Sequence, residues 1–211
     1  MAPPAVTLAD YRTQVRDLLR DKADDLRGSS TQKDRWINSG IRMRDIVTQA
    51  NRSLLSWTAT AASDSYTIAA IGNARVFDIV SVSVIYGNLR IVLEEMSFTK
   101  MNARLRAYSP VYQNCPVGYA RYGPTTIYLA PAPSQAFTLE ADCCVYSGDL
   151  TADDDADALP YPYTDPVPYY ACFKAKLYER RLDEALRYFN EFQARCASAQ
   201  GARTGQLMSA Y

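Results

Sequence analysis

The pattern of hydrophobic positions divides the chain into helical and extended regions. In the first fifty residues, apolar side chains recur every three or four positions, as on one face of an α-helix. Thr7 and Asp10 form a capping-box pattern before the first helix, and Ser30 is the expected N-cap of a second helix that ends near Asn51. The apolar positions are Leu8, Tyr11, Val15, Leu18 and Leu19 in the first helix and Trp36, Ile37, Gly40, Ile41 and Val47 in the second.

From residue 54 the hydrophobic period changes to two, which predicts β-strands. Residues 66–68 form a short strand, and residues 77–86 alternate between apolar and polar side chains over a longer one. Gly87 and Asn88 then turn the chain into residues 89–93. Two extended segments joined by a Gly-Asn pair are typical of a β-hairpin.

The second half of the β region contains three more expected strands and one short helix. Ser97 caps the helix, which runs over residues 98–106. Two strands flank Gly123 and Pro124, and residues 137–146 alternate regularly as a further strand. About six strands are therefore expected in total.

The last third of the chain returns to helical spacing after a long loop. The stretch 151–168 is acidic and then rich in proline, which favours a loop. Asp165 before Pro166 is the expected start of a helix, and the last helix ends near Gly201. The apolar positions are Tyr170, Phe173 and Leu177 in the first of these helices and Leu182, Ala185, Leu186, Phe189 and Cys196 in the second.

This order of elements predicts an α+β fold. Each terminal pair of helices has an apolar face that it cannot cover alone, so the two pairs are expected to pack as one helical bundle. The antiparallel β region, a sandwich or a small barrel, is inserted between them. The expected parts are residues 1–53 and 151–199 for the bundle, 54–150 for the β domain, and 200–211 for an extended tail.

Composition and charge are those of an ordinary globular protein. Of 211 residues, 48% are hydrophobic and 22% are charged, with 23 basic and 23 acidic side chains. This balance does not indicate a nucleic-acid or membrane partner. The first residues lack the features of a signal peptide, and no apolar run is long enough for a membrane span. Five cysteines without a C-x-x-C pair favour a reducing, cytosolic setting and no zinc site.

Few residues offer catalytic or metal-binding chemistry. The chain has no histidine, which removes the commonest general base and metal ligand. Glu94 and Glu95 are adjacent on an expected strand, so their carboxylates point to opposite faces. The aspartates at 153–157 lack the spacing, glycine and closing glutamate of an EF-hand. We therefore expect no catalytic residue, cofactor or metal, and a protein that is not an enzyme.

Tyrosines and a set of short motifs suggest an assembly protein. Sixteen tyrosines, more than one core needs, favour interfaces because the ring supplies area and the hydroxyl tolerates water. The chain also resembles the head-to-tail adaptor, or connector and head-completion, proteins of tailed bacteriophages over about residues 7–199. The motifs that carry this resemblance are Asp34-Arg35-Trp36-Ile37-Asn38, a strand entered through Tyr66, Pro116, Tyr119, Ile127-Tyr128-Leu129-Ala130-Pro131-Ala132-Pro133, and Leu159-Pro160.

The resemblance implies a structural virion protein with a defined set of partners. Such adaptors form a ring, typically of twelve copies, in the neck between capsid and tail, where they act in virus assembly and DNA ejection. The ring binds the portal protein on one side and a downstream tail or nozzle protein on the other. Genomic double-stranded DNA passes through its lumen without sequence-specific binding. Such proteins are made in the host cytoplasm and contact no membrane.

Two further functions are open alternatives. One is a virion-associated peptidoglycan hydrolase that uses carboxylates among Glu94, Glu95, Glu140 and Asp142. The other is a carbohydrate-binding β module with helical flanks. A zymogram tests the first, and glycan binding by the isolated monomer tests the second.

Two segments are candidate contact sites for partners. The hairpin tip, Gly87 and Asn88, projects from its strands and is expected to contact the next tail protein or a neighbouring subunit. The tail offers Arg203, Leu207, Met208 and Tyr211, which are expected to bind the portal. We expect this tail to be disordered when free and extended or strand-like when bound.

Overall fold

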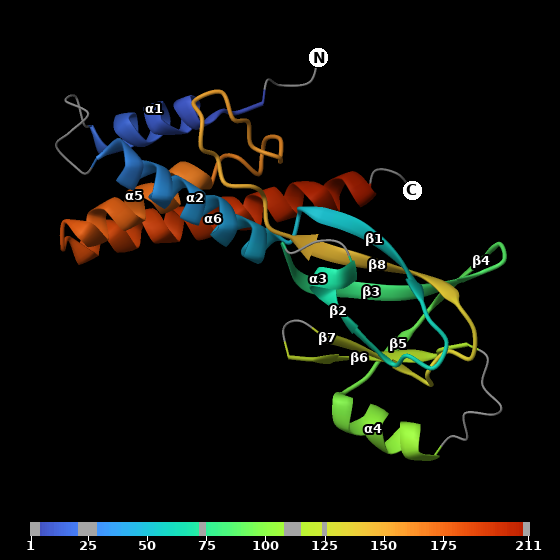
Figure 1. Cartoon of the computed structure of the whole chain (residues 1–211). Coiled ribbons are helices and arrows are strands. Elements are labelled where there is room, and N and C mark those ends of the chain that lie inside the picture. The colour runs from blue at the N-terminus through green and yellow to red at the C-terminus, as the bar shows by residue number, and fades with distance from the viewer. Residues whose placement is uncertain (1–4, 21–28, 72–74, 108–114, 124–125, 209–211) are drawn as a thin grey trace. The chain divides into compact units, whose positions relative to one another are not determined.

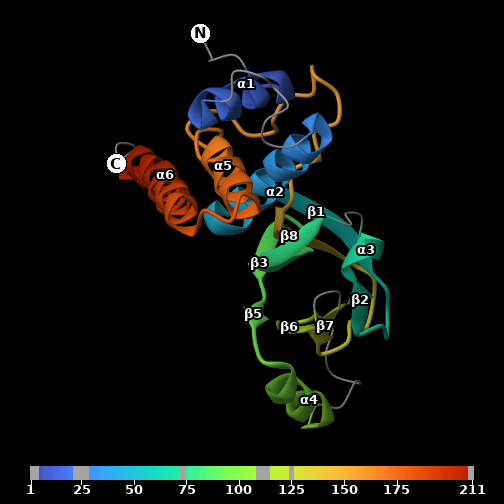
Figure 2. The same ribbon diagram turned by 90° about the vertical axis from the view of Figure 1, so that its left-hand side faces the viewer.

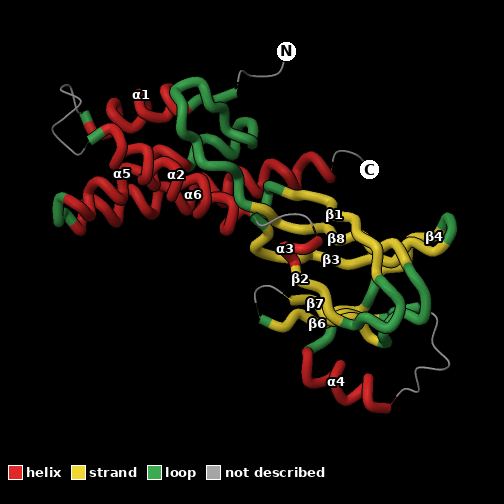
Figure 3. Tube along the Cα trace, viewed as in Figure 1, coloured by secondary structure: helices red, strands yellow, loops and turns green. Residues whose placement is uncertain are grey.

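The computed structural model describes residues 5–20, 29–71, 75–107, 115–123 and 126–208. Two helices come first, a block of strands with two short helices follows, and two helices complete the order (Figures 1 and 3). The prediction of an α+β protein is confirmed. The chain forms two compact units, a helical unit of Met1–Asn51 with Tyr146–Tyr211 and a β unit of Arg52–Val145.

Four helices build the helical unit: α1 Leu8–Leu19, α2 Ser30–Thr48, α5 Val167–Tyr178 and α6 Leu182–Met208. Helix α5 packs against each of the other three (Figure 2). Their apolar faces meet in two buried clusters. The buried members are Leu8, Tyr11, Val15, Leu19, Ile37, Ile41, Leu150, Val167, Ala171, Cys172 and Ala175 in one cluster and Tyr170, Phe192 and Cys196 in the other.

The helix ends show which local signals were read correctly. The capping box of Thr7 and Asp10 is present, so that prediction is confirmed. Helix α2 is capped by Ser29, one residue before the expected Ser30. Asp165 makes no capping hydrogen bond to α5, because its carboxylate accepts a bond from Arg195 Nη1 at 2.5 Å instead.

The β unit contains two sheets of four strands each. One has the order β1-β8-β3-β4 and the other the order β2-β7-β6-β5. Both sheets supply side chains to one buried core, with Val82, Val84 and Leu139 from the first sheet and Ile127 and Leu129 from the second. No barrel closes among the described strands. The strand bounds are β1 Arg52–Ala59, β2 Ser65–Thr67, β3 Val76–Tyr86, β4 Leu89–Val92, β5 Glu94–Glu95, β6 Gly118–Tyr122, β7 Thr126–Ala130 and β8 Phe137–Val145.

Two short helices complete the β unit. Helix α3 Ile68–Ile71 follows β2 directly, so Ile68 begins a helix and does not end a strand as expected. Helix α4 Phe98–Ala107 packs against β6 and β7 (Figure 3). Met101 on α4, with Met96, Ala120 and Ala130, forms a small buried cluster there. None of the described helices is long and apolar enough to cross a membrane.

The last helix is longer than the sequence pattern predicted. Helix α6 continues through Gly201 to Met208, so the expectation that it ends near Gly201 and gives way to an extended tail is wrong for residues 200–208. Glycine inside a helix costs only about 1 kcal/mol relative to alanine, and the residues that follow are mostly good helix formers. Tyr211 lies outside the described residues.

Candidate interaction surfaces

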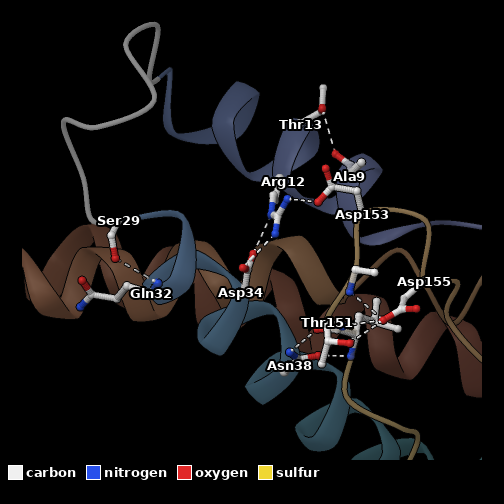
Figure 4. A network of polar contacts seen from close by, with 12 residues as sticks. Ala9, Arg12, Thr13, Ser29, Gln32, Asp34, Asn38, Thr151, Asp153 and Asp155 are labelled. Atoms are coloured by element: carbon white, nitrogen blue, oxygen red, sulfur yellow. Dashed lines mark hydrogen bonds and ion pairs between the residues drawn. The ribbon is translucent and has the colours of Figure 1, made fainter.

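The acidic loop, residues 151–157, is bound to the helical unit through its side chains and its backbone. Arg12 on α1 donates to Asp153 at 2.5 Å and to Asp34 on α2 at 2.6 and 2.9 Å (Figure 4). The carbonyl of Asp153 accepts a hydrogen bond from the N–H of Ala9 at 3.2 Å. This bond satisfies a donor in the first turn of α1, which has no partner within the helix.

Local hydrogen bonds hold the rest of this loop (Figure 4). The Asp155 carboxylate accepts bonds from the N–H groups of Ala152 and Thr151 at 2.8 and 2.6 Å, and these bonds lower its pKa because they favour the ionised form. The amide of Asn38 binds both the carbonyl and the N–H of Leu150 at 3.0 and 2.9 Å. Within the described residues, no group of three acidic or cysteine side chains could hold a metal ion.

A buried ionic network lies behind the loop. Arg44 on α2 donates through Nη1 to Asp157 at 2.6 Å and through Nη2 to Asp45 at 2.8 Å, and all three side chains are fully buried. The Tyr11 hydroxyl donates to Asp157 at 2.5 Å. The N–H of Ser147 donates to Asp45 at 2.7 Å. The network therefore joins α1 and α2 to Asp157 at the end of the loop and to Ser147 in the segment before the loop.

The protonation state of this network is fixed by its surroundings. Burial and the charge of Asp157 raise the pKa of Tyr11, so the phenol keeps its proton. Burial opposes the charge of Arg44, but attraction to Asp157 and Asp45 outweighs it and raises the pKa of the guanidinium. Asp157 thus acts as a counter-ion in the scaffold.

The four carboxylates considered for peptidoglycan hydrolysis are all ion-paired. The partners are Lys100 for Glu94, Arg121 for Glu95, Arg90 for Glu140 and Arg52 for Asp142. Arg121 also binds Asp78 on β3 and so connects the two sheets. Each of these carboxylates thus has a basic partner, and the geometry singles out none of them as an acid or nucleophile.

The predicted hairpin is present and carries apolar side chains at its tip. Gly87 has a φ of 59°, in the left-handed region that a two-residue turn requires. Tyr86 and Leu89 pair directly across the strands, and they are 53% and 65% exposed. The hairpin thus presents an aromatic and an aliphatic side chain beside the turn.

Strand β4 extends this apolar surface along the edge of its sheet (Figure 1). Leu89 and Ile91 share one face of the strand, Val92 lies on the other face, and all three are exposed. Edge strands of soluble proteins usually carry charges that discourage pairing, and apolar side chains on both faces are typical of a strand that is covered. The sequence analysis placed the contact at Gly87 and Asn88 and missed these side chains.

Three of the four candidate portal-binding residues lie at the end of α6, and the fourth, Tyr211, lies outside the described residues. Arg203 and Leu207 are four positions apart on the helical backbone, and Met208 is the last helical residue. The last buried core residue that the structure describes on α6 is Ala199. The next two residues, Gln200 and Gly201, are exposed.

One flank of α6 carries an exposed apolar ridge that the sequence analysis assigned to the core. We define the α6 ridge as Leu182 and Leu186, which are 63% and 55% exposed. The buried side chains of this helix are instead Ala185, Phe192, Cys196 and Ala199. These buried positions form a narrow stripe along the helix. The sequence analysis treated all apolar positions of the helix as one broad buried face, so it did not distinguish the stripe from the ridge.

The other flank of α6 lines a groove of about 680 Å³. We call it the α6 groove. The hydroxyl of Tyr188 donates to the carbonyl of Leu18 at 2.9 Å and ties α6 to the end of α1 beside it. Lys176, almost fully buried, pairs with Glu184 at 2.7 Å within it. The lining residues are Leu18, Leu19, Arg20, Tyr169, Lys176, Arg181, Glu184, Arg187, Tyr188 and Glu191.

Comparison with protein families gives a match over nearly the whole chain. A family model described as SU10 adaptor protein matches residues 6–210. The match covers the whole β unit, nearly all of the helical unit and all of α6. No curated protein matches the chain. The resemblance found in the sequence is therefore confirmed at the level of the family.

Proposed function

Because the chain belongs to the SU10 adaptor protein family, we propose that it joins the portal of a tailed bacteriophage to the tail. Copies of the chain form a ring in the neck of the virion, twelve in the arrangement that the sequence resemblance implies, and genomic DNA passes through the lumen. The observation that carries this proposal is the family match over nearly the whole chain. The balanced charge, 23 basic and 23 acidic side chains, suits DNA passage without tight binding.

The direct test is binding to the portal protein of the same phage. Mixing the purified chain with assembled portal should give a complex that co-sediments, and electron cryo-microscopy should show the chain as a ring on the portal. Virions should show the same ring between capsid and tail. A neck without this chain, or a chain that sediments apart from portal under all conditions, would refute the adaptor function.

The portal-facing element of this proposal is the end of α6, with Arg203, Leu207, Met208 and Tyr211 as contacts. Removal of residues 202–211 should abolish portal binding. The melting temperature should not change, because the helix is already exposed at Gln200 and Gly201, just before the deleted segment. Removal of residues 209–211 alone is the matched control, and it should weaken binding only partly, since it deletes Tyr211 and leaves the other three. Undiminished binding by the longer truncation contradicts this assignment.

The tail-facing element of this proposal is the hairpin around Gly87 and Asn88. Its support is the exposed Tyr86 and Leu89 beside the turn, since the buried centres of protein interfaces are more apolar than the rest of the surface and enriched in aromatic side chains. Asn88→Arg should leave folding intact and lower the yield of tailed particles. Ser56→Arg, on an exposed position of strand β1, is the control. Equal yields from the two variants would indicate that the tip is inert.

A further inference from the structure

The two flanks of α6 are complementary to each other. The α6 ridge, Leu182 and Leu186, is one turn of helix long and exposed. The α6 groove uses Glu184, Arg187 and Glu191 of the same helix. With about 3.6 residues per turn, the mean directions of these two sets differ by roughly half a turn around the helix axis. Every copy therefore carries a ridge and a groove on opposite sides of one rigid helix.

The groove has the chemistry to receive an apolar ridge. Leu18 and Leu19 from the end of α1 and the rings of Tyr169 and Tyr188 supply its apolar lining. Tyrosine and arginine are the side chains most often found at the energetic centres of interfaces. The groove therefore combines aliphatic surface with residues suited to a protein partner.

The charges around the two features are also complementary. In the groove, Glu184 is paired with Lys176 and Arg181, and Glu191 is paired with Arg195 outside it. Arg187 forms no ion pair with any residue that the structure describes. The intrahelical pair that the sequence suggested between Asp183 and Arg187 is not formed.

Asp183 lies between the two leucines of the ridge in sequence, and it too lacks an ion-pair partner among the described residues. Asp183 thus places a carboxylate about a quarter turn around the helix from the ridge, and Arg187 places a guanidinium in the groove. Arg20 adds a second positive charge to the groove lining. The apolar ridge with an acid beside it matches a groove in which leucine and tyrosine side chains lie among charged ones, most of them basic.

We propose that the α6 ridge of one copy docks in the α6 groove of the next copy, with Asp183 of the first beside Arg187 of the second. A contact that joins two different patches of identical chains is heterologous, and when its rotation closes it generates a ring. This inference rests on the proposed ring, and it assigns the contact between neighbouring copies to named side chains. The occupant of the groove is then a second copy of this chain.

A mixing experiment tests the contact directly. Asp183→Arg and Arg187→Asp each place like charges at the contact between identical copies, so each variant alone should lose self-association. In an equal mixture, the arginine that Asp183→Arg places beside the ridge meets the aspartate that Arg187→Asp places in the groove of the other variant. At the next contact around the ring, the native Asp183 of the second variant meets the native Arg187 of the first. Self-association should therefore return, with variants alternating. Sedimentation velocity over a concentration series measures association, and cross-linking with one variant isotopically labelled measures alternation.

Replacement in the ridge gives a second, independent test. Leu186→Asp should weaken self-association about ten-fold or more, as expected for a side chain at the centre of an interface. Leu54→Asp is the matched control, because Leu54 is a leucine of similar exposure, 58% against 55%, in the β unit. Both variants should keep the wild-type melting temperature, since both side chains are exposed in the folded chain.

The possible results separate this inference from the proposed function. A mixture that associates no better than the two variants alone, or single variants that associate as well as wild type, would overturn the ridge-and-groove contact. So would a wild-type chain that shows no association at any concentration and no cross-links between copies when bound to portal. A chain that self-associates through these residues but never binds portal would refute the adaptor function and leave the contact standing.

Discussion

The buried network around Arg44 makes a quantitative prediction about stability. Arg44→Met keeps much of the side-chain volume but leaves Asp45 and Asp157 buried without their shared counter-ion. Removal of one partner from a buried ion pair costs about 3–5 kcal/mol. A domain of this kind is stable by about 5–15 kcal/mol in total, so the variant should lose a large fraction of its free energy of unfolding.

A matched control lies two positions earlier on the same helix. Arg42 pairs with Asp149 at 2.5 Å, but both side chains are about half exposed. Exposed ion pairs contribute about 0–1 kcal/mol, so Arg42→Met should cost little. Both arginines bind aspartates of the segment that follows the β unit, and the two variants therefore differ mainly in burial. The expected difference between them is about 2 kcal/mol or more in the free energy of unfolding.

The assay should report on the helical unit alone. Trp36 lies in this unit with its ring 6.0 Å from that of Tyr178, and Trp57 lies in the β unit. In a Trp57→Phe background, urea unfolding followed by tryptophan fluorescence therefore reports the helical unit. The indole nitrogen of Trp57 is buried without a hydrogen-bond partner among the described residues, so this replacement removes no bond. If Arg44→Met costs no more than Arg42→Met, the network does not stabilise the unit as argued.

Two further predictions concern glycines and thiols. A Cβ at Gly118 would collide with the methyl group of Met96, which is buried, and would lie 3.0 Å from the carbonyl oxygen of Glu94, whereas a Cβ at Gly201 would meet nothing. Gly118→Ala should therefore destabilise the β unit by about 1–3 kcal/mol in urea unfolding. Gly201→Ala should stabilise α6 by about 0.5–1 kcal/mol and raise the helical signal in circular dichroism. A stabilising Gly118→Ala and a destabilising Gly201→Ala would refute both arguments. Cys115 is half-buried and the other four cysteines are buried, so a thiol reagent should label Cys115 first in the folded chain and all five thiols in urea. Rapid labelling of more than one thiol before unfolding would contradict the burial.

Local signals were the most reliable part of the sequence analysis. The capping box of Thr7 and Asp10 and the turn at Gly87 depend on a few adjacent residues, and both are present. The strand at 77–86 was also found, and Val82 and Val84 are buried as its alternation predicts, but Val80 is not. Register shifts in β3 fall before Asp78 and around Val80, so Ile79 is buried and Val80 is exposed, against the predicted alternation. A bulge inserts a residue and changes the face, and this cannot be read from periodicity alone.

Contacts between residues far apart in the chain could not be predicted from the sequence pattern. In the sequence, the aspartates of the acidic loop are typical of a solvent-exposed charged segment. In the structure they pair with Arg12 and Arg44, which lie more than a hundred positions earlier in the chain. Strand β5 is two residues long and pairs in parallel with β6. A parallel pair has no hairpin turn between its strands, so turn residues in the sequence do not predict it. The α6 groove is likewise formed by three helices, so no single stretch of sequence predicts it.

The helical backbone of residues 202–208 changes the physical argument for portal binding. An extended segment of about ten residues would lose on the order of 10 kcal/mol of backbone entropy on docking. Burial of three large side chains returns only about 5–8 kcal/mol, so an extended tail would need backbone hydrogen bonds to the portal. Because α6 is already helical to Met208, most of that entropy cost is absent and side-chain burial alone can stabilise the contact.

This argument predicts that the shape of the segment matters for portal binding. Gln206→Pro removes a helical hydrogen bond and costs about 3 kcal/mol in a helix interior, so it should disrupt the last turn that positions Leu207 and Met208. Gln206→Ala is the control and should bind portal as tightly as wild type. Affinity for assembled portal can be measured by co-sedimentation for both variants. If the proline variant binds as tightly as the alanine variant, the segment docks in an extended form and the helical end of α6 has no role in the contact.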